Sequence, residues 1–268
     1  MVRQPTTPSE IITKGPEEKV GKVKSLGHMH FPAWLANNPI FRKAFLLRKL
    51  YLSKTSFSHY SQYAEDVSIF LLYPKKNDGF FVDVGCFHPK KYNNIFALYR
   101  RGWRGVNIDI DPLKIAAFDM ARSGDTNIAC AVSNQTGETE YFSDGIYSLT
   151  ISLDKNFAES RGGYISKKTR VDTLTNILDG TKYQGRQIDL LSVDAEAHDF
   201  EVIKSLDFKR YSPRLIAVET HLRLLPDVMR TDLYKYLDQL NYCIVGWCGL
   251  TLLFASETFQ KTLAAQPL

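Results

Sequence analysis

The 268-residue chain is 44% hydrophobic and 24% charged, as soluble globular proteins are, and it can form one large domain with an extension or at most two domains. It has no apolar run of the roughly 20 residues that a membrane span needs. The polar first twenty residues show no signal-peptide pattern, so we expect a cytoplasmic protein with no transmembrane segment.

The formal net charge of +5 is unevenly placed. Residues 1–60 hold ten Lys and Arg against three Glu, whereas the rest of the chain holds 24 Lys and Arg against 26 Asp and Glu. The basic character therefore belongs to an N-terminal extension, which we place at residues 1–57. An acidic substrate, a membrane surface or nucleic acid are its alternative partners, and a solvated extension without a partner is equally compatible with the charge.

Within the extension, residues 1–27 are polar and are expected to be loose. The sequence then becomes apolar and aromatic, and Pro39 suits the first turn of a helix that ends near Leu52. The basic pairs Arg42-Lys43 and Arg48-Lys49 do not form a single stripe, which argues against a membrane-surface helix. We expect this partly helical segment to pack against the domain that follows it.

Residues 58–268 alternate between helical and strand-like patterns, which predicts an α/β domain with a mostly parallel sheet. In chain order, the expected elements are a helix capped by Ser61, a strand over 80–85, a helix over 93–102, a strand over 103–109, a helix from 111 to 122, strands over 126–133 and 138–143, a helix ending near 178, a strand over 188–194, a helix through 202–206, a strand over 214–221, a helix over 233–240 and a closing antiparallel pair over 242–245 and 250–254. Residues 144–168 are poorly periodic, so they form either a substrate loop or a surface connection.

The first strand and its turn indicate the kind of ligand. The strand carries Asp83 and stops at Gly85, and Cys, Phe, His and Pro follow. A dinucleotide-binding turn needs a G-x-G-x-x-G pattern to approach a pyrophosphate, and this turn has a single glycine. The sequence therefore favours a nucleoside without phosphates, with an acid nearby to meet a cation, such as S-adenosylmethionine.

Further cofactor contacts are expected after the next two strands. Asp109 lies 24 positions after Gly85, at the place where an acid accepts hydrogen bonds from ribose hydroxyls, and Ile110 follows it. Asp125 and the strand end at Ala131 and Val132 are expected to border the adenine.

These residues resemble the FkbM family of S-adenosylmethionine-dependent methyltransferases. The resemblance covers roughly residues 58–255 and implies a Rossmann-like class I methyltransferase fold, a mostly parallel twisted sheet with helices on both faces. It also implies methyl transfer, usually to a hydroxyl on a sugar or natural-product scaffold. Ala64 and Ala197 stand where the family usually has glycine, and we expect φ < 0 at both. The matching pieces are Ser61–Asp66, Phe81–Gly85, Leu98-Tyr99, Gly102–Asp109, Ala131–Ser133, Val171–Leu174, Ile188–Glu196 and Val218-Glu219.

The ends of the fourth and fifth strands carry the expected catalytic residues. Their order places Asp194, Glu196, His198, Glu219 and His221 around one mouth. Asp194 and Glu219 are expected to be hydrogen-bond acceptors or ligands of a divalent cation such as Mg²⁺, and His198 or His221 is the expected base. Asp194 is also expected to contact the cofactor.

The start of the first helix offers one more candidate. Glu65, with Asp66, either closes over the cofactor or marks a plain helix start.

Two other functions stay open on the sequence. A non-catalytic module could keep the fold to bind a glycan or a partner, and a nucleotide-cofactor oxidoreductase or epimerase is disfavoured by the single-glycine turn. Nucleic acid is not expected as a substrate, because the body is slightly acidic and has no N/D-P-P-[YF] motif. The acceptor, the metal requirement and the oligomeric state, including a homo-oligomer, are not specified by the sequence.

Overall fold

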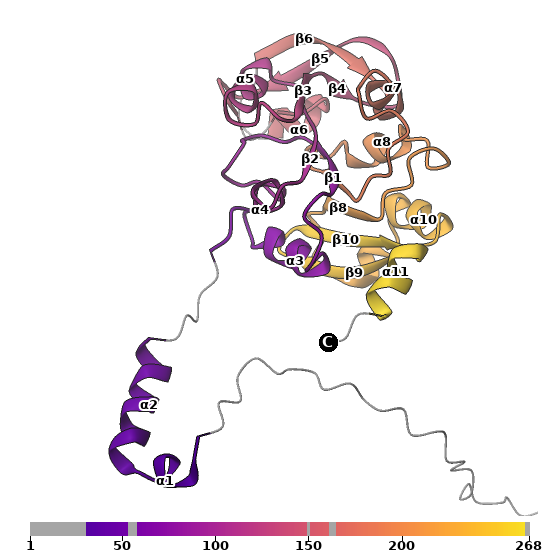
Figure 1. Cartoon of the computed structure of the whole chain (residues 1–268). Coiled ribbons are helices and arrows are strands. Elements are labelled where there is room, and N and C mark those ends of the chain that lie inside the picture. The colour runs from indigo at the N-terminus through magenta and orange to yellow at the C-terminus, as the bar shows by residue number, and fades with distance from the viewer. Residues whose placement is uncertain (1–30, 53–57, 149–150, 161–164, 266–268) are drawn as a thin grey trace, which may run out of the picture. The chain divides into compact units, whose positions relative to one another are not determined.

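A computed structural model describes residues 31–52, 58–148, 151–160 and 165–265 (Figure 1). The expectation that residues 1–27 are loose concerns residues outside these described ranges. The chain divides into two compact units, residues 1–57 and 58–268. None of the helices in the described ranges is long and apolar enough to cross a membrane.

The first unit contains α1 (Ala33–Ala36) and α2 (Pro39–Tyr51). Asn38 caps α2, because its side chain accepts hydrogen bonds from the backbone N–H groups of Ile40 and Phe41. Pro39 occupies the first turn of α2, as the sequence predicts.

In the described part of the second unit, a seven-stranded sheet has the order β3-β2-β1-β7-β8-β10-β9. The first five strands of that order are parallel to one another. β10 runs antiparallel to β8, and β9 runs antiparallel to β10, which confirms the expected Rossmann-like α/β fold with an antiparallel C-terminal pair. The direction of winding reverses at β1, the topological switch point where such sheets bind ligands. The strands are β1 (Phe80–Val84), β2 (Arg104–Asp109), β3 (Thr126–Ala129), β7 (Leu190–Val193), β8 (Leu215–Glu219), β9 (Tyr242–Cys248) and β10 (Thr251–Ser256).

Alternate residues of the central strand enter two separate cores, because successive side chains of a strand point to opposite faces. Phe80, Val82 and Val84 belong to one core and Phe81 belongs to the other. Helices therefore cover both faces. The first core packs under α7 (Leu174–Asp179), α8 (Asp199–Lys204), α9 (Leu225–Val228) and α10 (Asp232–Gln239), and the second packs under α3 (Glu65–Leu72), α4 (Phe96–Arg100) and α11 (Glu257–Ala264). The remaining helix beside the sheet, α5 (Pro112–Ala121), packs Ile115 and Phe118 on Cys86.

A second sheet, which the sequence did not predict, has the order β4-β6-β5. The expected strand over 126–133 divides at Cys130, whose N–H donates to the Asp109 carbonyl, and β4 (Ala131–Val132) pairs with β6 (Ile165–Asp172) instead of continuing in the main sheet. β6 also pairs with β5 (Gly137–Ser143). The region over 144–168 is thus partly regular, with α6 (Lys155–Ser160) and the start of β6.

The expected cap of α3 is wrong. Ala64, not Ser61, stands at the N-cap position, and the Ser61 hydroxyl instead donates to the Asp66 carboxylate at 2.6 Å. The expectation of φ < 0 at the two alanines is also wrong, since φ is 66° at Ala64 and 72° at Ala197. The loops keep the left-handed geometry that glycine would adopt freely.

The helix after β1 is shorter than predicted. It begins at Phe96, because the Asn93 side chain turns inward, donates to the Asp83 carboxylate and accepts from the Ile95 N–H and from Arg122.

Candidate active site at the carboxyl ends of the parallel strands

A cavity of about 330 Å³ lies at the carboxyl ends of the parallel strands, where the loops after β1, β2, β7 and β8 meet β4. The structure brings most of the sequence-predicted site residues together there. Those that line the cavity are Gly85, Asp109, Ile110, Ala131, Val132, Asp194, His198, Glu219 and His221.

Three predicted cofactor contacts do not line this cavity and have other partners. Asp83 accepts from Asn93 beneath the cavity floor, and burial raises its pKa to about 6. Asp125 accepts from the Gly105 N–H and from Asn107 beside β2, and Glu65 accepts from the Tyr63 N–H at the start of α3. Direct cofactor contact by these three carboxylates stays a prediction.

Gly85 allows β1 and β7 to come together at the cavity. Its φ is +76°, and a Cβ atom at this position would lie 1.7 Å from the carbonyl oxygen of Asp194. Glycine is therefore required here both by the backbone conformation and by space.

Asp109 is fixed before any ligand arrives. Its carboxylate accepts from the N–H groups of Phe87 at 3.0 Å and Asp111 at 2.9 Å, and the Lys114 ammonium lies 3.6 Å away. Burial raises the pKa of Asp109, and the Lys114 charge opposes that rise. The β1 turn is thereby tied to the end of β2, so the acid that we expect at the ribose faces the cavity in a defined position.

Asp194 and Glu219 form a carboxyl pair. Val193 and Val218 are opposite each other in the parallel register of β7 and β8, so the next residues leave neighbouring strands side by side. The two side chains are hydrogen-bonded to each other, which requires a shared proton. Burial and the nearby Asp194 charge raise the pKa of Glu219 to about 9. Asp194 opens onto the cavity but is otherwise enclosed by protein atoms. This burial also raises the pKa of its carboxyl.

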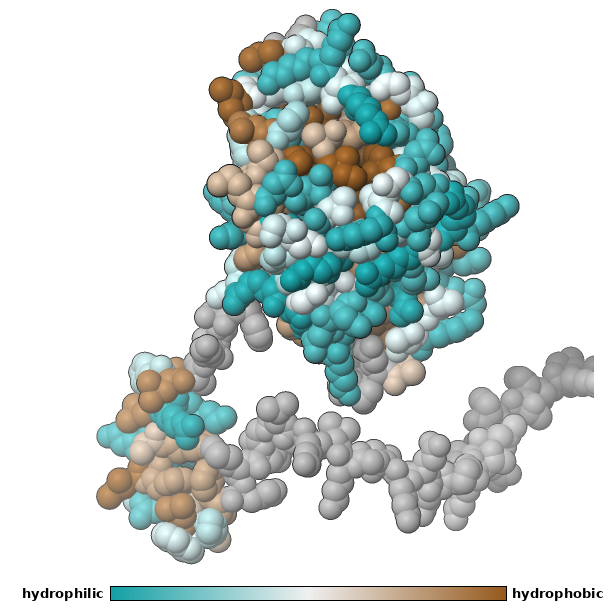
Figure 2. Space-filling view, turned by 45° about the horizontal axis from the view of Figure 1, so that its top comes forward, coloured by the Kyte–Doolittle hydropathy of each residue, from teal (hydrophilic) through white to brown (hydrophobic). Residues whose placement is uncertain are grey.

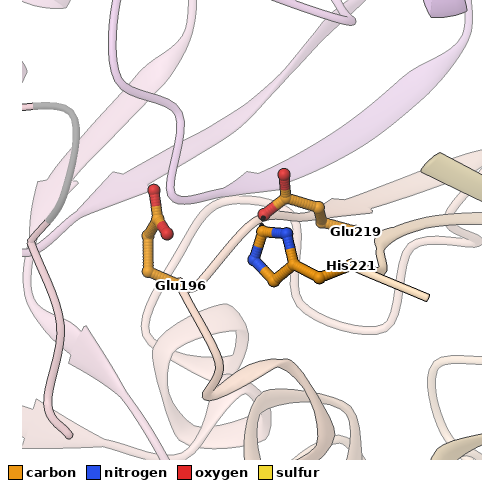
Figure 3. A group of neighbouring side chains, drawn as sticks. All are labelled: Glu196, Glu219 and His221. Carbon is orange, nitrogen blue, oxygen red and sulfur yellow. Dashed lines mark ion pairs between the residues drawn. The ribbon is translucent and has the colours of Figure 1, made fainter. Parts of the chain in front are cut away.

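Glu196, Glu219 and His221 surround a common space (Figure 3). One ligand atom from each residue lies within 4.8 Å of the others, and His221 Nε2 is 3.9 Å from Glu219 Oε2. Two of the three come from the end of β8, and Glu196 comes from the loop after β7. A carboxylate beside an exposed imidazole is an arrangement that can hold the ring and stabilise its protonated form.

His198 is separate from this group. Its Nε2 lies 3.0 Å from the Ser133 hydroxyl at the end of β4, and burial lowers its pKa. Of the two expected bases, only His221 has a carboxylate partner close to the cavity mouth.

The loop between β7 and α8 is held by a carboxylate that sequence reasoning missed. Asp199 accepts from the Ala195 N–H at 2.9 Å, and burial raises its pKa to about 7. A second tie comes from Ser152, whose hydroxyl donates to the Glu196 carbonyl at 2.9 Å. Ile151 and Leu153 on either side of Ser152 line the cavity, so part of the region over 144–168 contributes to the site.

Three aromatic residues that meet near the β1 turn were also not predicted to belong to the site. Phe87 and Tyr92 line the cavity with their rings stacked at 6.4 Å, and Tyr147 meets Phe87 edge-on at 5.7 Å. All three have positive φ, between 50° and 58°. Strained backbone of this kind gathers at functional sites.

The charge of the cavity suits a cation. Among the described lining residues, four carry carboxylates, whereas Lys114 is the one lysine or arginine. The position of Lys114 could have been anticipated, because it stands three residues after Asp111, the N-cap of α5, where a side chain points back toward the end of β2.

Comparison with known proteins shows the family of the chain. A TehB-like SAM-dependent methyltransferase from Corynebacterium glutamicum ATCC 13032 Kitasato aligns with 82% of this chain and 100% of that chain, at 11% identity and a TM-score of 0.38, a likeness too low to carry an argument. No curated protein matches significantly. Residues 77–243, more than half of the chain, match the family model described as the methyltransferase FkbM domain. The protein therefore belongs to the FkbM methyltransferase family.

Proposed function

We propose that residues 58–268 form an S-adenosylmethionine-dependent methyltransferase that methylates a hydroxyl group on a sugar, glycan or natural-product scaffold. Membership of the family supports methyl transfer. The observation that supports the cofactor assignment is the acidic cavity at the switch point of the sheet, where doubly wound folds bind their ligands.

The lining residues divide into three regions along the cofactor. Ile110, Ala131 and Val132 would give an apolar surface for the adenine, and Asp109 would accept hydrogen bonds from the ribose hydroxyls, since all four line the cavity. Gly85 and Asp194 line the end of the cavity that would take the amino-acid part, and the missing side chain at Gly85 lets the Asp194 backbone approach β1 there. When bound, S-adenosylmethionine supplies a methyl group on a positively charged sulfur, and the carboxylates compensate that charge and the charge of its ammonium.

His221 is the proposed general base. It lies at the mouth of the cavity with Glu219 beside it, so it can take the proton from an acceptor hydroxyl while the negative charge shared by Asp194 and Glu219 stabilises the resulting imidazolium. Glu196 faces the same space and can hold a second acceptor hydroxyl by hydrogen bonding. The protein's main contribution is alignment, because displacement at a sulfonium needs no covalent help.

A divalent cation such as Mg²⁺ is a second means of lowering the acceptor pKa. Glu196, Glu219 and His221 would be its ligands, rather than Asp194 with Glu219, because these three offer ligand atoms within 4.8 Å of one another and Asp194 is not in that group. The two arrangements differ in a measurable way, since only the metal-assisted reaction stops in the presence of a chelator.

The two alanines that stand where the family usually has glycine do not favour a non-catalytic module. Both Ala64 and Ala197 adopt the left-handed conformation that glycine adopts freely. An oxidoreductase is disfavoured by the acidic cavity, which would repel a pyrophosphate.

The test is release of S-adenosylhomocysteine from S-adenosylmethionine with a panel of monosaccharides, oligosaccharides and simple natural-product alcohols, with Mg²⁺ and with a chelator. We expect turnover with a hydroxyl acceptor and a loss of roughly 10²-fold or more in His221→Ala, the usual contribution of a general base. Asp238→Asn, on the exposed surface of α10, is the control. Full activity of both His221→Ala and Glu219→Gln would refute the proposed mechanism.

A further inference from the structure

The unit that contains α1 and α2 has a markedly apolar surface. Within it, Trp34 is 74% exposed, Ile40 79%, Leu50 68% and Tyr51 77%. In the described residues 31–52, no side chain of either helix is buried. Figure 2 shows the contrast, since brown and tan side chains dominate this unit whereas the visible face of the second unit is mostly teal. Exposed apolar surface of this density marks a binding surface.

Helix α2 has two apolar faces, and one of them is already occupied. Phe41 and Phe45 pack with Phe31, with ring centroids 4.9 Å and 5.8 Å from it. At 100° per residue, Ile40, Leu46, Leu47 and Leu50 lie on the other side of the helix, and all four are exposed. A groove of about 430 Å³ runs along this outer face.

Basic residues border the outer face on both sides. Helical geometry places Arg42 and Lys49 along one edge and Arg48 beyond the other, while Lys43 lies within the face, where its long stem can extend along an apolar surface. In the sequence, the absence of a single basic stripe argued against a membrane-surface helix. The exposed apolar face with basic residues on both of its borders is the observation that reverses this expectation. Residues 31–52 contain no Asp or Glu.

We propose that the outer face of α2 binds an anionic phospholipid surface. Leucine and isoleucine side chains would enter the boundary between headgroups and acyl chains, and the four basic side chains would meet lipid phosphates at its edges. Trp34 and Tyr51 are aromatic residues of the kind that occupy this boundary, and both are exposed. An acidic protein is the alternative occupant, and the vesicle experiment distinguishes it because the vesicles contain no protein.

The experiment is flotation of the full chain with vesicles of phosphatidylcholine alone and with about one-third phosphatidylglycerol, at low and physiological salt. We expect at least about tenfold more protein on the anionic vesicles at low salt, with the difference falling as salt is raised. Leu46→Glu combined with Leu50→Glu should reduce binding to the level of neutral vesicles. Arg42→Gln combined with Lys43→Gln should reduce only the anionic preference.

Met120→Glu is the matched control, because Met120 is 90% exposed on α5 in the second unit and should leave binding unchanged. Since Leu46 and Leu50 are exposed, their variant should keep the melting temperature of the wild type. Absence of wild-type binding to anionic vesicles, or equal binding by the Leu46/Leu50 variant, would overturn the proposal. A lowered melting temperature of that variant would also overturn it, because the face would then pack against protein.

Discussion

Two alanines occupy backbone positions that glycine would fill without strain. Ala64 begins α3 with φ 66°, and Ala197 lies in the loop that carries Glu196 with φ 72°. A left-handed conformation costs an L-residue roughly 1–2 kcal/mol, and the surrounding contacts must hold it in place. The expected sign was wrong because it followed the local preference of alanine for φ < 0, and the surrounding contacts override that preference at both positions.

Relief of this strain gives a stability prediction. Ala197→Gly should raise the free energy of unfolding by up to about 1 kcal/mol, because the relieved strain exceeds the extra flexibility of glycine in the unfolded chain. Ala116→Gly, at an exposed position inside α5, should instead lower it by about 1 kcal/mol. Denaturant unfolding of the two variants checks the opposite signs, and a destabilised Ala197→Gly would contradict the observed conformation.

Single residues were predictable where spacing alone sets their place. Gly85 and Asp109 follow directly from the strand ends and their separation, and both line the cavity. Lys114 was not anticipated, although its spacing from the N-cap of α5 indicates its place. Asp199 and Phe87 were not anticipated because their places depend on how a loop folds back. No short-range pattern records such contacts.

At the scale of elements, the register of β7 and β8 organises the acidic end of the site. It places Asp194 beside Glu219, and the following loop returns through Asp199 to begin α8. The Asp199 carboxyl is buried where it orders that loop, so its protonation is coupled to folding.

This coupling predicts a pH dependence of stability with a definite sign. Burial raises the pKa of Asp199 from 3.8 to about 7, so its contribution to stability is complete below about pH 4 and is lost as pH rises to 7. Between pH 5 and 8 the free energy of unfolding of wild type should fall relative to Asp199→Asn by roughly 2–3 kcal/mol. Asn keeps a carbonyl acceptor for the Ala195 N–H.

Chemical unfolding at several pH values measures this difference. Asp238→Asn makes the same change of charge on an exposed surface and should run parallel to wild type across the range. A constant difference between wild type and Asp199→Asn would show that this carboxyl does not titrate near neutrality.

Elements were well predicted where hydrophobic periodicity is local. The strands of the main sheet and the closing pair of β9 and β10 appear where the sequence places them. The second sheet was missed, because β4 pairs with a strand that begins more than thirty residues later, and β4 itself is only two residues long. Pairing over such a distance is decided by tertiary contacts that the local pattern does not contain.

At the scale of the whole molecule, the alternation of strands and helices was sufficient to predict a doubly wound sheet, and with it the edge at which a ligand binds. The cavity lining was less predictable where Ile151, Leu153 and Tyr92 come from irregular segments. The extension adds a second unit whose exposed apolar face is outside the family match.

Calorimetric titration with S-adenosylmethionine tests the central claim most directly. Wild type should bind in the micromolar range, about −8 kcal/mol, and Asp109→Asn should bind at least about tenfold more weakly because a ribose acceptor is lost. Asp238→Asn should bind as wild type does. Absence of binding by folded wild type, or undiminished binding by a folded Asp109→Asn variant, would contradict the placement of the cofactor in this cavity.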